Sequence, residues 1–237
     1  MFLHLLSKLY CPLESPLSTF EECLLSLVDR KLSVSPGLHT FPASAFGSKS
    51  KLLHPAHVRE RDILLVACSE LGSAPDNVSF QTPSRCVILQ HLAGSIPSRD
   101  ECESIEGLGS AFDSVEALFD RYDFRHVILS GHLHCGVIRN WLGPPAYKKS
   151  DIGSFRARFE KGTRDFVDEN YKASNAERRF TLMVCEHVLC QIDNLLTHSF
   201  VADRVQSGAT DLHGWILDDK TARVHGYSPT ESAFLPL

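Results

Sequence analysis

Three short, uninterrupted runs of apolar residues constrain the fold of this chain more than any other feature of its sequence. We expect them to form strands at 62–68, about 86–90 and 126–130. A helix is predicted over roughly 103–122, between the second and third runs, with Val115 and Phe119 on its apolar face. Apolar strands that alternate with helices are typical of an α/β fold, with a central, mainly parallel sheet and flanking helices.

The C-terminal half of the chain is predicted to complete the same α/β domain. Residues 151–206 are expected to be largely helical, because Met183, Val188 and Leu195 follow the spacing of an apolar helix stripe. The chain then returns to strand over 212–217, and a turn leads to a further strand at about 222–227. No internal repeat interrupts this pattern, so a single domain is expected.

The first 58 residues have a different character. We assign 1–58 to an N-terminal arm and 59–237 to the α/β domain. The arm contains a capping pattern beginning at Ser18, which predicts a short helix, and then a segment at 32–58 rich in Ser, Pro, Gly and His. Such a segment has no core of its own, so it is expected to wrap a neighbour or a second subunit.

Composition argues against two classes of partner and indicates a cellular location. The net charge is −5 and no strong cluster of Lys and Arg is present, which argues against a nucleic-acid partner. No segment is long and apolar enough to cross a bilayer, so no membrane partner is expected. The eight cysteines, together with the lack of a convincing secretory signal, favour a reducing cytoplasmic location.

Cysteine and histidine residues stand where two of the predicted strands end. Cys68 ends the first strand, while His132 and Cys135 follow the third. The carboxyl ends of parallel strands meet at one edge of a sheet, where such folds place their ligands. Zinc favours thiolate and imidazole donors, and three protein ligands leave a fourth position for water. A lone Cys or His near a strand is more often simply buried, so the pattern alone leaves both interpretations open.

The order of these residues resembles the β-class carbonic anhydrases. That family carries a Cys-x-Asp-x-Arg motif, which Cys68-Ser69-Glu70-Leu71-Gly72 matches in part, and a Gly-His-x-x-Cys-Gly motif, which residues 131–136 match fully. Further similar pieces are Phe80-Gln81, Ala93-Gly94 and Leu212-His213-Gly214-Trp215. The resemblance covers about residues 60–227. Each piece alone is common, whereas their combination in this order is specific.

The resemblance implies an activity and a set of site residues. Cys68, His132 and Cys135 are expected to bind Zn²⁺, and a zinc-bound hydroxide would attack carbon dioxide to give bicarbonate. Gln81 is expected to donate a hydrogen bond to bicarbonate, as the matching glutamine does in plant-type members. Family members are dimers or larger, so a homodimer or a higher homo-oligomer is also implied.

The departures from the family pattern leave the activity open. The family's aspartate is Glu70 in this chain, and the arginine that holds it away from the metal is Gly72. Glu70 is therefore expected to act as a base, to close the zinc site as a fourth ligand, or to accept backbone N–H groups at a turn. His91 stands where the family has a different polar residue, and His134 is expected at the pocket rim.

Besides a carbon dioxide hydratase, the sequence therefore leaves two other functions open. The first is an impaired pseudo-enzyme in which Glu70 closes the zinc site and the protein binds bicarbonate or a partner. The second is a zinc hydrolase for another small electrophile. A missing arginine at position 72 favours these two, whereas the three metal ligands and Gln81 favour the hydratase.

Overall fold

The computed structural model describes residues 31–53, 59–71, 85–104, 108–143, 155–172, 175–218, 220–221 and 223–237. The chain divides into two units, residues 1–30 and 31–237, and every described residue belongs to the second. The helix expected after Ser18 lies outside the described residues, as do Gly72 and Gln81.

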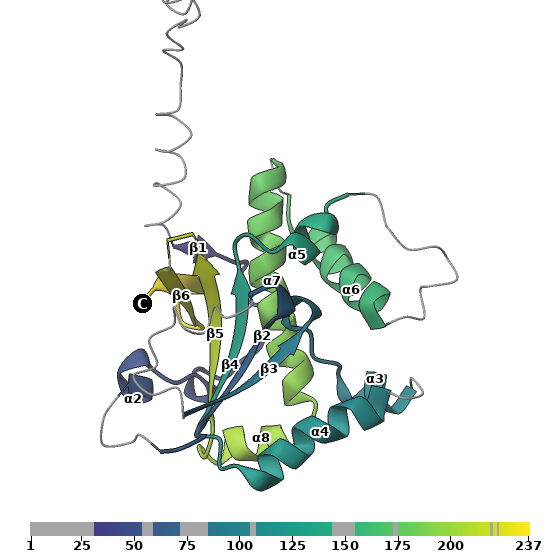
Figure 1. The fold of residues 1–237 in the computed structure, drawn as a ribbon. Coiled ribbons are helices and arrows are strands. Elements are labelled where there is room, and N and C mark those ends of the chain that lie inside the picture. The colour runs from purple at the N-terminus through teal and green to yellow at the C-terminus, as the bar shows by residue number, and fades with distance from the viewer. Residues whose placement is uncertain are drawn as a thin grey trace, which may run out of the picture. The chain divides into compact units, whose positions relative to one another are not determined.

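A mixed sheet forms the centre of the described domain (Figure 1). Seven strands of the described residues pair in the order β1-β7-β6-β5-β4-β2-β3. They are β1 (Leu32–Ser33), β2 (Ile63–Cys68), β3 (Cys86–His91), β4 (His126–His132), β5 (Asp211–Asp218), β6 (Arg223–Ser228) and β7 (Ala233–Pro236). Strands β3, β2, β4 and β5 are parallel, and β6, β7 and β1 continue the sheet in antiparallel pairs. The predicted α/β fold is confirmed, while the short strands β1 and β7 were not predicted.

Most of the described helices lie in the predicted regions, but the helix Lys49–Leu53 lies in the segment 32–58, where no helix was expected. The α-helices are α2 (Lys49–Leu53), α3 (Arg99–Ser104), α4 (Leu108–Arg121), α5 (Gly136–Asn140), α6 (Phe155–Asn170), α7 (Ala176–Leu196) and α8 (Ser199–Gln206). Short 3₁₀ turns are η1 (Ala43–Ala45), η3 (Ser69–Leu71) and η6 (Leu92–Gly94). The helix expected over 103–122 corresponds mainly to α4, and the helical region 151–206 is divided into three helices. None of the described helices is long and apolar enough to cross a membrane.

The core lies on both faces of strand β2, all of whose residues are buried. Leu64 and Val66 face the larger apolar cluster, which includes residues of α4, α5, α6, α7 and α8. Leu65 and its neighbours on the opposite face join a smaller cluster that contains Leu52 of α2. Each such buried side chain contributes roughly 1.5–3 kcal/mol. Burial on both faces explains why the strand sequence is continuously apolar instead of alternating.

Helix α7 packs closely against the carboxyl end of β4. Its side chains Val184 and Val188 lie beside Gly131, where an added Cβ would come within 2.8 Å of a Val188 methyl group. A glycine at this position therefore allows the helix to approach the strand. The close packing fixes the residues that follow Gly131, and these include the candidate metal ligands.

The described part of the N-terminal segment contacts its own chain. Leu32 of β1 pairs with Phe234 of β7, and Phe46 forms a bridge with Leu212 of β5. The His39 imidazole lies 2.7 Å from a carboxylate oxygen of Glu186 on helix α7. Residues 31–53 thus pack on the sheet and on α7, while the division of the chain at residue 58 stays a prediction.

Candidate metal centre

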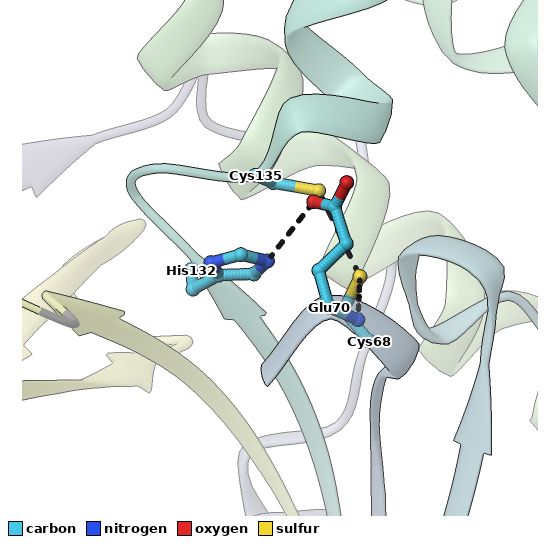
Figure 2. A group of neighbouring side chains, drawn as sticks. All are labelled: Cys68, Glu70, His132 and Cys135. Atoms are coloured by element: carbon cyan, nitrogen blue, oxygen red, sulfur yellow. Dashed lines mark hydrogen bonds and ion pairs between the residues drawn. The ribbon is translucent and has the colours of Figure 1, made fainter. Parts of the chain in front are cut away.

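Two neighbouring strand ends bring four potential ligands together. Cys68 is the last residue of β2, and His132 is the last residue of β4, the strand that pairs with β2 in parallel. The turn η3 carries Glu70 directly after Cys68, and Cys135 is the N-cap residue of α5. Figure 2 shows the four side chains pointing toward one another. The structure therefore brings together the three predicted ligands and Glu70.

The distances suit a single metal ion. One ligand-type atom from each of the four residues lies within 4.8 Å of all the others. The sulfur atoms of Cys68 and Cys135 are 3.9 Å apart. Two thiolates on one tetrahedral zinc ion lie about 3.8 Å apart, given a Zn–S bond of about 2.3 Å. Because Cys68, His132 and Cys135 are also buried, this donor set fits a tetrahedral ion that prefers sulfur and nitrogen.

The surroundings of the two thiols favour a single negative charge on the pair. The pKa of Cys68 is lowered to about 5, mainly through its hydrogen bond with Cys135, with further help from His132 and the Glu70 amide. The pKa of Cys135 is raised, because the neighbouring Cys68 sulfur and burial both disfavour a second negative charge. One thiolate of the pair therefore forms readily, and the second forms when a positive charge is supplied. A bound divalent cation would supply that charge.

Glu70 is held by the backbone of α5. Its Oε2 atom accepts hydrogen bonds from the amides of Gly136 and Val137, at 2.7 and 3.3 Å. The same oxygen lies 4.0 Å from Nε2 of His132. The carboxylate accepts backbone N–H groups, as one of the sequence interpretations expected, but the donors belong to α5 and not to the turn that carries Glu70.

The two other histidines singled out in the sequence lie near this cluster but contribute no atom to it. His91 ends β3 beside Cys68 and is half-buried, and burial lowers its pKa. Nδ1 of His134 lies 3.9 Å from a carboxylate oxygen of Asp218, at the end of β5. Neither histidine belongs to the described group of metal-ligand atoms.

Sequence reasoning missed the two amides that hold Glu70. Gly136 was matched as the last residue of the Gly-His-x-x-Cys-Gly motif, but the match gave it no role. A Cβ at Gly136 would lie 2.9 Å from Oε1 of Glu70, so the glycine leaves room for the carboxylate. The glycine within the motif was a signal, whereas a backbone amide leaves no mark on the sequence.

Comparison with known proteins gives one family. The family model described as carbonic anhydrase matches residues 64–224. A carbonic anhydrase from Synechococcus elongatus is 25% identical over 198 residues, which are 83% of this chain and 71% of that protein. Carbonic anhydrase 1 of Escherichia coli is 23% identical over 202 residues, which are 85% of this chain and 90% of that protein.

Solved structures share the fold at low sequence identity. The β-carbonic anhydrase CcaA superposes with a TM-score of 0.59 at 22% identity, over 80% of this chain and 90% of that one. A Coccomyxa β-carbonic anhydrase in complex with acetazolamide superposes with a TM-score of 0.55 at 15% identity, over 90% of this chain and 86% of that one. These superpositions support the mixed α/β fold described above.

Proposed function

Because the chain belongs to the β-class carbonic anhydrase family, we propose that it is a zinc enzyme that catalyses the reversible hydration of carbon dioxide to bicarbonate. The observation that carries this proposal is the convergence of Cys68, His132 and Cys135 from two adjacent strand ends. Their sulfur spacing and burial suit a zinc ion, and their order along the chain is that of the family motif.

The proposed ligands determine the chemistry of the site. Cys68 and Cys135 would supply two negative sulfur donors, and His132 a neutral nitrogen donor. When bound, zinc supplies a Lewis acid that activates water near neutral pH. The amides of Glu70 and Ile138 donate to the sulfur atoms of Cys68 and Cys135, at 3.4 and 3.5 Å, and so stabilise both thiolates.

Glu70 is the proposed catalytic carboxylate. Its side chain is 41% exposed, so it can exchange protons with solvent while its carboxylate stays beside the metal ligands. A carboxylate in this position can accept the proton that the reacting water loses. Gln81, which lies outside the described residues, remains the proposed donor to bicarbonate by its match to the family.

The alternative is a protein in which Glu70 itself fills the fourth position on the metal. The closeness of its carboxylate to all three ligands favours this interpretation. Such a protein would act by binding bicarbonate or a partner, or it would act on another small electrophile. The two functions differ in whether zinc-loaded protein hydrates carbon dioxide.

We also propose a homodimer or a higher homo-oligomer, and a cytoplasmic location. One solved chain, which superposes with a TM-score of 0.54 at 16% identity, comes from a description of two tetrameric β-carbonic anhydrases of Sordaria macrospora. The location rests on the eight cysteines, which suit a reducing compartment. Small-molecule carbon dioxide and bicarbonate would be the ligands, without a nucleic acid or membrane partner.

Stopped-flow measurement of carbon dioxide hydration tests the proposed activity. The zinc-loaded full chain should accelerate hydration between neutral and alkaline pH, and the Cys68→Ser variant should not. Zinc content is measured on the same samples. A chain that holds about one zinc ion and yet leaves the uncatalysed rate unchanged would overturn the hydratase proposal and favour the closed site.

A further inference from the structure

The Glu70 carboxylate is held by main-chain amides where the family pattern has a positively charged side chain. Among the described residues, no Lys or Arg forms an ion pair with Glu70. The segment 72–84, which follows it in the chain, contains neither Lys nor Arg. The donors that Glu70 does have are the consecutive amides of Gly136 and Val137. Within the described part of the chain, main-chain amides therefore fix this carboxylate.

Gly136 contributes both a donor and free space. Its amide makes the shorter bond, at 2.7 Å, to Oε2 of Glu70. An added Cβ would meet Oε1 at 2.9 Å, Oε2 at 3.4 Å and the carboxyl carbon at 3.5 Å. A methyl group this close to the whole carboxylate would push the side chain out of position. The backbone of Gly136 has no positive φ, so alanine can adopt its conformation.

The amide bonds place the carboxylate just short of the position of a metal ligand. Nitrogen and oxygen donors on one tetrahedral zinc ion lie about 3.4 Å apart, given bond lengths of about 2.1 Å. Oε2 of Glu70 is 4.0 Å from Nε2 of His132, whereas the two sulfur atoms already match the spacing of a shared ion. The carboxylate therefore lies beside the fourth position without filling it.

We propose that Gly136 is a positioning residue for Glu70: its amide, its missing side chain and the Val137 amide together hold the carboxylate off the metal. This inference rests on the proposed function, because it requires a metal bound by Cys68, His132 and Cys135. It explains how the site keeps a position open for water although residue 72 is a glycine. Loss of the two amide contacts would release the carboxylate onto the nearest positive charge, which is the metal.

Cobalt substitution tests the inference without measuring turnover. The full chain is loaded with Co²⁺, and its visible absorption and its affinity for azide are measured. Gly136→Ala should change the cobalt spectrum and raise the azide Kd at least about tenfold, because the released carboxylate competes for the fourth position. The matched control is Gly143→Ala, since the nearest atom to a Cβ there is 3.6 Å away, and it should match the parent.

A double-mutant cycle shows that the effect acts through Glu70. In a Glu70→Ala background, Gly136→Ala should shift the azide Kd by less than about twofold, because no carboxylate remains to be released. An azide Kd that does not rise in Gly136→Ala, or a rise that persists in the Glu70→Ala background, would overturn the inference and leave the metal site intact. Failure of the parent chain to bind Co²⁺ would instead overturn the proposed function.

An NMR measurement keeps the inference testable if Gly136→Ala does not fold. In the zinc-loaded protein, the amide protons of Gly136 and Val137 should resonate downfield, as donors to a carboxylate do. Glu70→Ala should move these two resonances upfield more than any other amide of α5. Unchanged resonances would show that the carboxylate does not accept from these amides, and the inference would fail.

Discussion

Strand β4 begins and ends with a histidine, and the two histidines have different chemical surroundings. At the carboxyl end, His132 lies in the group formed with Cys68, Glu70 and Cys135. At the amino end, Nδ1 of His126 lies 3.2 Å from Nε2 of His213 on the neighbouring strand β5. Both histidines of β4 are buried, so burial alone does not separate the two ends.

The difference lies in what the neighbouring groups already do. At the amino end, the carboxylate of Asp211 is paired with Lys51 at 2.6 Å, and the two imidazoles bond to each other. Burial lowers the pKa of both histidines, so His126 and His213 are both neutral at neutral pH. They lie beside the ion pair of Lys51 and Asp211. At the carboxyl end, the pKa of Cys68 is lowered and that of Cys135 is raised, so the pair carries one negative charge unless a cation stabilises the second. Among the described residues, the carboxyl end of β4 therefore gathers groups that could hold a cation, whereas at the amino end Lys51 already supplies the positive charge.

The strongest effect should be the loss of metal at the carboxyl end alone. Cys68→Ser should weaken zinc binding by more than about 100-fold, because it removes a thiolate ligand and not merely an outer hydrogen bond. His213→Gln, at the amino end, should keep about one zinc ion per chain. Chelator competition followed by metal analysis measures both variants. Equal zinc loss from the two variants would remove the distinction between the ends.

The next effect separates the two functions offered for Glu70. Glu70→Gln keeps an oxygen acceptor for the amides but removes the basic carboxylate, so kcat for hydration should fall about 100-fold. Zinc content should stay the same. Glu177→Gln, an exposed carboxylate on α7, serves as the matched control. A rise in kcat on Glu70→Gln would indicate that the native carboxylate blocks the metal.

The histidine pair at the amino end of β4 should make the folded protein less stable in acid. The pKa of His213 is lowered to about 3 by burial, with smaller contributions from His126 and Lys51, whereas the unfolded value is 6.5. Folding therefore disfavours the charged imidazole: the stability is intact above pH 6.5 and is lost as the pH falls toward 3.

His213→Gln should remove this acid sensitivity. Between about pH 7 and 5, the zinc-free variant should lose about 2 kcal/mol less unfolding free energy than the parent. Urea unfolding of both proteins at a series of pH values gives this difference. If the unfolding free energies of the two proteins depended on pH in the same way, His213 would not be kept neutral by the fold.

The weakest effect concerns the arginine that the family motif has at position 72. Because main-chain amides already hold Glu70, Gly72→Arg should change kcat/KM by less than about twofold. Stopped-flow hydration by the zinc-loaded variant measures the change. An increase of about tenfold or more would show that a missing clamp limits this protein, contrary to the proposed role of Gly136.

The sequence predicted the fold best at the strands of the central parallel sheet. Continuous apolar runs predicted β2 and β4, because a strand buried on both faces leaves a run that no exposed segment shares. The run at 86–90 also predicted β3, although β3 is an edge strand whose residues are only partly buried. The positions of Cys68, His132 and Cys135 followed from where those strands end.

Features that depend on the backbone escaped prediction. Strand β1 has two residues, too few for any periodic pattern, and it forms only because β7 offers an edge. The hold on Glu70 uses amides, which every residue except proline possesses, so residue identity could not reveal it. The length of the Glu70 side chain and the bare Cα of Gly136 gain their meaning only in three dimensions.

Anomalous diffraction at the zinc edge, from crystals of the zinc-loaded full chain, would locate the metal itself. We expect one strong peak at the carboxyl ends of β2 and β4, bonded to both sulfur atoms of Cys68 and Cys135 and to a ring nitrogen of His132. A peak located elsewhere, or bonded to only some of these three side chains, would rule out the metal centre on which the proposed function depends.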